Sequence, residues 1–153
     1  MLEELEPDLC EIDLRRIVDF GHGFSPLFEM KVIDELLHGE AVAIDMAIST
    51  VISANRDLLD WQSANRISNL LNKIGLLITH EVCTEDCLID SLSDVAKHRG
   101  GRQSLPIPLQ IGTARFLDDV SLDECNTAYS YLAEFFSQYT RPSNRELIDA
   151  SGI

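Results

Sequence analysis

The segment "EAVAIDMAISTVISANRDLL", residues 40–59, carries the strongest helix pattern in the chain. Its apolar and small residues recur at helical spacing, and Ile44, Ile48 and Ile52 widen the apolar stripe. A helix that is apolar on most sides is typical of a buried position, so we expect protein to surround it. Asp45 lies inside the stripe, where a carboxylate needs a hydrogen-bond partner on a neighbouring element.

Apolar patterns on either side of this segment predict further helices. The expected ranges are 11–18, 26–37, 61–78, a helix capped by Thr84 and ended at 100–101, and a last helix opened by the capping box Ser121–Glu124. Only "LPIPLQIG" and "TARFL" are strand-like, and the prolines restrict them to a sheet edge or an extended loop. The sequence therefore predicts a mainly α protein with a short extended or β segment near 105–117.

The composition describes an ordinary globular domain with an unusual charge. The 153 residues are 45% hydrophobic and 25% charged, which predicts one helical domain over 1–140 and a polar tail over 141–153. The net charge of −14 disfavours nucleic acid and anionic membrane surfaces as partners. The acidic start is not a signal peptide, no apolar run reaches a membrane span, and four scattered cysteines indicate reduced thiols. We expect a cytoplasmic protein.

Two histidines stand beside glycines at the start of apolar segments: His22 in "DFGHGFSP" and His38 in "LLHGEAVAIDM". Two imidazoles bind a zinc-like ion, but a catalytic site normally needs a third protein ligand, often a carboxylate. Gly21, Gly23 and Gly39 would let the backbone approach closely. From spacing alone, however, structural histidines remain the simpler interpretation. Glu40 could orient a ligand or simply favour the helix N-terminus.

The same two motifs resemble the sugar phosphate cyclase superfamily, whose best-known members are the dehydroquinate synthases. In that superfamily a G-H motif and an L-H-G-E motif supply two ligands to zinc or cobalt, and His22 and His38 fall on these positions. Asp19 and Pro26 match the 2-epi-5-epi-valiolone synthase branch, and so does Glu40. The resemblance extends over residues 5–116 and includes "KHRGGRQSLPIPLQIG", residues 97–112. Gly23 departs from it, since a serine or threonine is usual there.

The resemblance implies a reaction and a set of residues. Sedoheptulose 7-phosphate would be oxidised transiently by NAD, lose phosphate, be reduced again and close by aldol addition. The implied metal ligands are His22 and His38. The implied catalytic residues are Asp19, Lys97 and Arg99, and the implied substrate-binding residues are Asp19, His98 and Arg102. For the basic residues, a solvated helix end that complements the helix dipole is an equal alternative.

The family's N-terminal NAD-binding domain, which supplies a glutamate as the third metal ligand, has no counterpart in this sequence. No G-x-G-x-x-G and no alternation of strands and helices is present. We therefore expect a helical C-terminal metal- and substrate-binding part that is inactive alone. It would work with a separate NAD-binding chain, or it would be a truncated fragment of a cyclase. The alternative is a non-catalytic interaction module that retains the fold, and a homo-oligomer is possible in each case.

Overall fold

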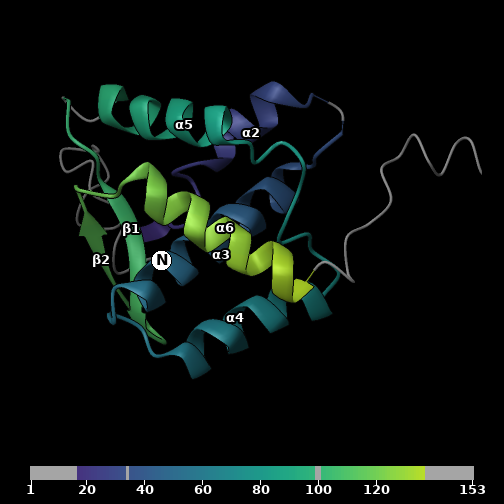
Figure 1. Cartoon of the computed structure of the whole chain (residues 1–153), viewed down its shortest axis with the longest axis vertical. Coiled ribbons are helices and arrows are strands. Elements are labelled where there is room, and N and C mark those ends of the chain that lie inside the picture. The colour runs from purple at the N-terminus through teal and green to yellow at the C-terminus, as the bar shows by residue number, and fades with distance from the viewer. Residues whose placement is uncertain (1–16, 34, 99–100, 137–153) are drawn as a thin grey trace, which may run out of the picture.

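The structure is a computed structural model that describes residues 17–33, 35–98 and 101–136. In chain order its elements are η2 (Ile17–Asp19), α2 (Ser25–Lys31), α3 (His38–Asn55), α4 (Trp61–Lys73), α5 (Glu85–His98), β1 (Leu105–Gln110), β2 (Thr113–Leu117) and α6 (Leu122–Phe136). Figure 1 shows the helices with a small antiparallel hairpin at one edge. The predicted fold class is confirmed, because helices dominate and β1 and β2 occupy the segment near 105–117.

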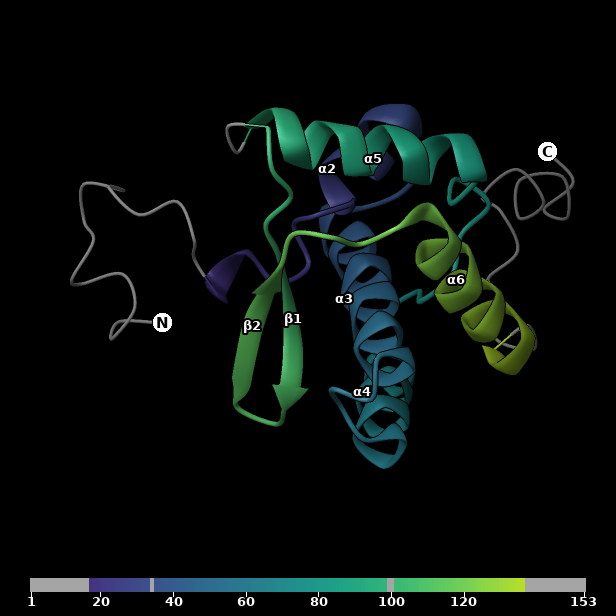
Figure 2. The same cartoon turned by 60° about the vertical axis from the view of Figure 1, so that its left-hand side comes forward.

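The central element is α3, the helix predicted from residues 40–59. It packs against α2, α4, α6 and β1, and it runs down the middle of the molecule with the hairpin and α6 on opposite sides (Figure 2). Ile44, Ile48 and Ile52 are each at most 1% exposed. Removing three such side chains from water stabilises the fold by roughly 2 kcal/mol each. The helix is therefore buried on most sides, as the apolar pattern predicts.

The second helix ends earlier than the pattern predicts. α2 stops at Lys31, and Val32 has φ −131° and ψ 58°, outside the helical region. The apolar rhythm of 26–37 continues in the sequence, but the chain turns back at Val32, whose carbonyl accepts from the Glu35 N–H. This turn buries Leu36 at 6% exposure while Ile33 is 75% exposed. The prediction of a helix through residue 37 is thus wrong, because tertiary packing of Leu36 overrides the local periodicity.

The fourth helix also ends before the predicted residue 78. α4 stops at Lys73, and Gly75 adopts a positive φ of 85°. The Leu76 N–H donates to the Leu71 carbonyl and the Gly75 N–H to the Asn72 carbonyl, which is the hydrogen-bond pattern of a Schellman cap. Gly75 therefore terminates the helix. Ile78 is buried, but from the loop that follows.

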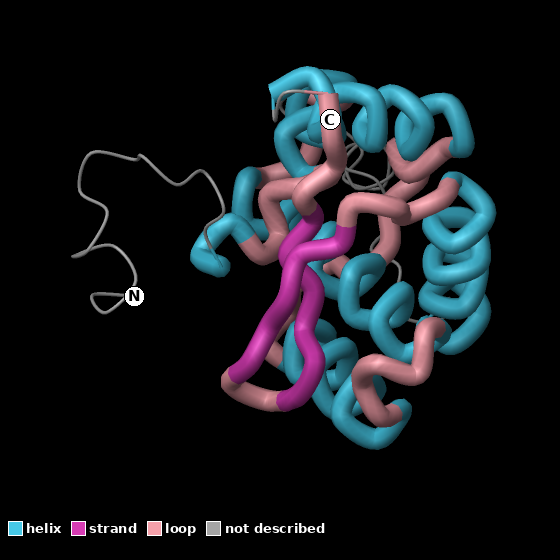
Figure 3. The backbone as a smooth tube through the Cα atoms, turned by 90° about the vertical axis from the view of Figure 1, so that its left-hand side faces the viewer, coloured by secondary structure: helices cyan, strands magenta, loops and turns pink. Residues whose placement is uncertain are grey.

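The remaining elements begin at the predicted capping residues. Thr84 Oγ1 accepts from the Cys87 N–H at the start of α5. At α6, Ser121 Oγ accepts from the Glu124 N–H while Glu124 Oε2 accepts from the Ser121 N–H at 2.9 Å, a complete capping box. The hairpin pairs Leu105 with Leu117 in antiparallel register, and Figure 3 shows it lying along one side of the helices.

Some sequence predictions concern residues outside the described ranges. These include the chain before residue 17, Arg99, and the boundary between the domain and the tail at 140–141. The part of the predicted 11–18 helix that is described is a single 3₁₀ turn, Ile17–Asp19. Within the described residues, none of the helices combines the length and the apolar character needed to cross a bilayer.

Candidate metal and substrate site

The loop that carries His22 is held tightly against α3. Gly21 has φ +87°, and a Cβ there would lie 2.8 Å from both Val42 Cγ1 and Met46 Cγ. The backbone is thus in a left-handed conformation that favours glycine and is too close to α3 for any side chain. The His22 N–H donates to the Asp19 carbonyl at 2.8 Å, which closes the turn. Gly21 therefore lets the chain place His22 beside the central helix.

Asp45 anchors the segment that follows His22. It is 1% exposed, and its Oδ2 accepts from the backbone N–H groups of Phe24 and Ser25. Its Oδ1 accepts from Ser49 Oγ one turn further along α3. Burial raises the pKa of Asp45, and the donated hydrogen bonds oppose this rise. The partner that the sequence requires for this carboxylate is therefore the N-terminus of α2 and the loop before it.

His38 is the first residue of α3, and the start of that helix is fixed by Glu40. Glu40 Oε2 accepts from the Leu37 N–H at 3.1 Å, and Glu40 itself is only 8% exposed. Of the two roles considered for Glu40, this contact supports the helix N-terminus, through the residue before His38. The His38 ring itself contacts α2, because its Nδ1 lies 2.9 Å from Glu29 Oε1.

The structure brings the two histidines together. The ring centroids of His22 and His38 are 5.5 Å apart, with an angle of 51° between the ring planes. Two imidazoles that share one tetrahedral zinc through Zn–N bonds of about 2.1 Å have centroids about 5 Å apart. The pair thus fits a shared zinc-like ion. Among the described residues, no group of three or more His, Cys, Asp or Glu side chains is placed to hold one.

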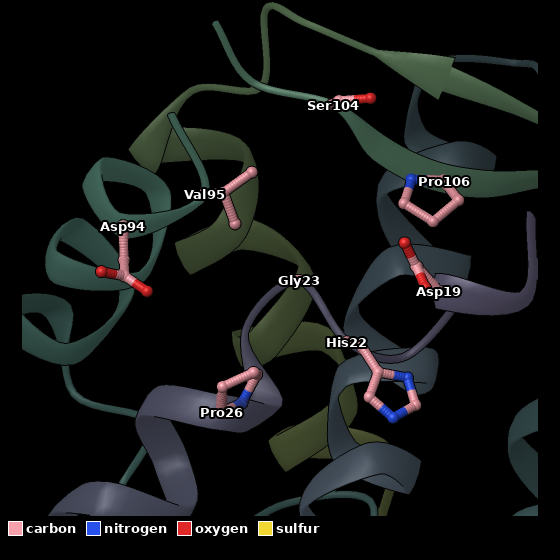
Figure 4. A pocket seen from close by; sticks show the side chains of 8 residues that line it. All are labelled: Asp19, His22, Gly23, Pro26, Asp94, Val95, Ser104 and Pro106. Atoms are coloured by element: carbon pink, nitrogen blue, oxygen red, sulfur yellow. The ribbon is translucent and has the colours of Figure 1, made fainter. Parts of the chain in front are cut away.

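A cavity of about 300 Å³ is lined by His22, while His38 is not part of its lining. It is formed by the His22 loop, the first turn of α2, the end of α5 and the start of β1 (Figure 4). Its lining residues are Asp19, His22, Gly23, Pro26, Asp94, Val95, Ser104 and Pro106. Ser104 is 8% exposed and its hydroxyl has no hydrogen-bond partner among the described residues. An unpaired buried hydroxyl at a cavity wall is a position where a polar ligand can bind.

Of the predicted basic residues, Lys97 and Arg102 have described side chains, and neither is part of the lining of this cavity. Lys97 is on the last turn of α5 and is exposed, and Arg102 is exposed in the connection to β1. His98 ends α5, but its side chain and the whole of Arg99 lie outside the described residues. Asp19, by contrast, lines the cavity next to His22. The structure thus places Asp19 and His22 at the cavity and leaves Lys97 and Arg102 outside its lining.

Three residues at the site escape the sequence reasoning: Glu29, Asp94 and Ser104. Ser104 has a weak signal, because it directly precedes the strand-like "LPIP" segment inside the matched motif. From the sequence pattern, Asp94 is an ordinary solvated acid of α5 and Glu29 is an ordinary acid of α2. Their positions depend on how α2 and α5 pack against the rest of the domain. The turn at Val32 ends α2. Local periodicity therefore cannot identify them.

The glycines of the motifs have different roles. A Cβ on Gly23 would lie 2.2 Å from Leu105 Cδ2, so a larger residue there needs the buried Leu105 side chain to move. A glycine in place of the usual serine or threonine at residue 23 therefore leaves room for the Leu105 side chain. At Gly39 no atom lies within 4 Å of a built Cβ. The expectation of close backbone approach at Gly39 is wrong for the described residues, because the first turn of α3 is open there.

Most of this chain matches known proteins. Residues 2–98 match the family model described as "3-dehydroquinate synthase C-terminal". The chain belongs to this family. It is 48% identical over 134 residues to the 2-epi-5-epi-valiolone synthase of Streptomyces hygroscopicus subsp. jinggangensis strain 5008. It is 32% identical over 141 residues to the demethyl-4-deoxygadusol synthase of Trichormus variabilis.

A solved relative has the same fold. The structure of the Streptomyces hygroscopicus 2-epi-5-epi-valiolone synthase, with NAD⁺ and Zn²⁺ bound, matches 88% of this chain with a TM-score of 0.85. The match covers 38% of that solved chain. The two relatives above are covered over 32% and 34% of their length, so the chain spans about a third of the curated relatives it matches. The helical domain described here is thus a dehydroquinate synthase-like C-terminal domain.

Proposed function

We propose that this chain is the metal- and substrate-binding part of a 2-epi-5-epi-valiolone synthase-like cyclase. The observation that carries the proposal is the pairing of His22 and His38, whose ring centroids are 5.5 Å apart, together with the cavity that Asp19 and His22 line. The substrate would be a ketose phosphate such as sedoheptulose 7-phosphate, with elimination of phosphate and ring closure. The relationship to 2-epi-5-epi-valiolone synthases, at 48% identity to one of them, supports this choice.

The residues divide the work according to their positions. His22 and His38 would hold zinc or cobalt, which supplies Lewis-acid polarisation of hydroxyl and carbonyl oxygens when bound. Asp19 would accept hydrogen bonds from substrate hydroxyls and exchange a proton with one of them. Ser104 would donate its unpaired hydroxyl to a substrate oxygen. Lys97 and Arg102 would face the phosphate from the border of the cavity, with His98 and Arg99 contributing from the same segment.

Two functions must come from outside the described residues. The first is a third metal ligand, because two imidazoles alone leave the ion weakly held. The second is NAD, which the reaction uses for a transient oxidation. We propose that both are provided by an NAD-binding part, either on a separate chain or on a further segment of a longer polypeptide. The solved relative contains both NAD⁺ and Zn²⁺, and this supports the assignment.

The test is affinity purification of a tagged chain from its native cells, with metal, NAD and cyclase activity measured on the eluate. We expect stoichiometric metal, bound NAD and phosphate release from sedoheptulose 7-phosphate. His22→Ala and His38→Ala should remove the metal and the activity. The matched control is His80→Gln, since His80 accepts from the Val82 N–H in a turn away from the cavity. Full metal content in the His22→Ala, His38→Ala double variant would contradict the proposal.

A non-catalytic interaction module is the second candidate, and one observation favours it. An apolar groove of about 380 Å³ lies between the hairpin and α3, lined in part by Phe20, Met46 and Ile111. If this chain only binds another protein, the double histidine variant should retain its partner and every measurable property of the complex. Loss of NAD and metal from the eluate of that variant would exclude this candidate.

A further inference from the structure

The carboxylate of Glu29 joins two elements at the histidine pair. Its Oε1 lies 2.9 Å from His38 Nδ1, so α2 and the first turn of α3 meet through this contact. The His38 side chain is 65% exposed and that of Glu29 is 32% exposed. An exposed histidine explores several rotamers unless a partner holds its ring. With Nδ1 directed to Glu29, Nε2 is the ring nitrogen that remains available to a ligand.

Glu29 sits on a helix that is itself fixed. The N-terminus of α2 is bound by Asp45, and Phe28 is completely buried. At the other end of the helix, Lys31 Nζ lies 2.8 Å from Asp90 Oδ2 on α5. The carboxylate of Glu29 is therefore presented from a rigid element rather than from a loop. A rigid acceptor loses little rotamer freedom when it holds an imidazole, so it can fix the ring's direction.

Glu29 does not complete the metal site as a ligand. It touches the Nδ1 side of His38, and within the described residues no trio of His, Cys, Asp or Glu groups is placed around one point. A carboxylate that accepts from the far nitrogen of a metal-binding histidine fixes its tautomer and raises its basicity. We propose that Glu29 is a positioning residue that holds the His38 ring with Nε2 directed to the point it shares with His22. This inference rests on the proposed metal-binding function.

The alternative role for Glu29 is a surface ion pair, which contributes little to stability and nothing to metal affinity. The two roles differ in what removal of the charge does. Glu29→Gln keeps the size and an acceptor oxygen but loses the negative charge that lies beside His38 Nδ1. Mutation of such a carboxylate typically lowers metal affinity about 10- to 100-fold. A surface pair predicts no change in affinity.

The experiment is a Zn²⁺ titration of the full chain, followed by NMR of the ¹⁵N-labelled imidazoles of His22 and His38. We expect both rings to shift in the wild type, and Glu29→Gln to weaken the affinity about 10-fold. The matched control is Glu35→Gln, which removes the same charge from an exposed position in the turn after α2. It should bind Zn²⁺ as the wild type does.

The metal-free spectrum provides a second measurement that a purely structural role would not change. We expect the neutral His38 ring of the wild type to carry its proton on Nδ1, and Glu29→Ala to remove this preference. A predominant Nε2–H tautomer in the wild type, or equal Zn²⁺ affinity of Glu29→Gln and wild type, would overturn the role of Glu29 alone. Failure of the His22 and His38 signals to respond to Zn²⁺ would instead overturn the proposed metal site itself.

Discussion

At the scale of single residues, Asp45 supports the site although it is not part of the cavity lining. Replacement by alanine would leave the buried N–H groups of Phe24 and Ser25 without an acceptor. Each such loss costs roughly 1–3 kcal/mol, so we expect Asp45→Ala to lower the free energy of unfolding by about 3 kcal/mol. Asp45→Asn retains one carbonyl oxygen for both donors and should lose less than half as much. Urea denaturation measures both, and equal losses would contradict the argument.

Gly21 and Gly39 form a natural pair of tests, because they flank the two histidines in opposite environments. Gly21 combines φ +87° with contacts at 2.8 Å, whereas Gly39 has open space around its Cβ position. We expect Gly21→Ala to destabilise the fold by about 2–4 kcal/mol through backbone strain and overpacking. Gly39→Ala, on the first turn of α3, should be neutral or slightly stabilising. Thermal unfolding of the two variants measures the difference, and similar losses would contradict it.

Many of the single residues at the candidate site can be predicted from the sequence. The motifs around His22 and His38, together with Asp19, locate the candidate site, and the buried position of Asp45 follows from its place in an apolar stripe. Glu29 and Ser104 do not follow, since their roles arise from contacts between elements far apart in the chain. Periodicity records what a residue does within its own helix. It carries no information about which acid of α2 will face the start of α3.

At the scale of elements, the end of α3 is tied to the start of α6 through Arg56. Its guanidinium donates from Nε and Nη2 to both oxygens of Glu124, with an Nη2 to Oε2 distance of 2.9 Å. This hydrogen bonding to Arg56 lowers the pKa of Glu124 to about 2. The pair thereby holds the capping box of α6 against the central helix, at the end of α3 away from His38.

The lowered pKa of Glu124 makes part of the stability depend on pH. Because the folded-state pKa of about 2 lies below the ordinary value of 4.5, this contribution is complete above pH 4.5 and is lost as the pH falls towards 2. Glu124→Gln keeps one acceptor oxygen for the cap but cannot titrate, so its unfolding free energy should vary less over that range. Glu134→Gln, on the exposed face of α6, is the matched control. Identical pH profiles for wild type and Glu124→Gln would contradict this role.

The helices whose signals are local were predicted well, and those whose ends depend on packing were not. α5 and α6 begin next to their predicted capping residues, because caps act within one turn, whereas α3 begins at His38, two residues before the predicted Glu40. α2 ends at Lys31 because Leu36 is buried from a turn instead of from a helix face. α4 ends at Lys73, two residues before Gly75, although the apolar residues beyond this glycine suggest continuation. A conflict between a stop signal and periodicity is resolved by tertiary contacts.

At the scale of the whole molecule, the net negative charge opposes the binding of an anionic substrate in the cavity. The chain carries a net charge of −14, and Asp19 and Asp94 line the cavity. A sugar phosphate is repelled by such a field unless local cations compensate, and Lys97 and Arg102 are exposed cations close in sequence to residues that line the cavity. On the proposed function, binding of a sugar phosphate should therefore weaken with added salt.

The incomplete coverage of its relatives leads to a prediction for the lone chain. The purified protein with Zn²⁺, NAD⁺ and sedoheptulose 7-phosphate should release no phosphate above background. It spans only about a third of its relatives, and among its described residues no group of three or more His, Cys, Asp or Glu side chains is placed to hold a metal ion. Addition of the remaining two thirds of a related synthase as a separate chain should restore turnover to the wild type. The same addition should restore no turnover to the His38→Ala variant, whereas it should restore turnover to the His80→Gln variant. Turnover by the lone chain would show that the third ligand and the NAD site lie within these 153 residues.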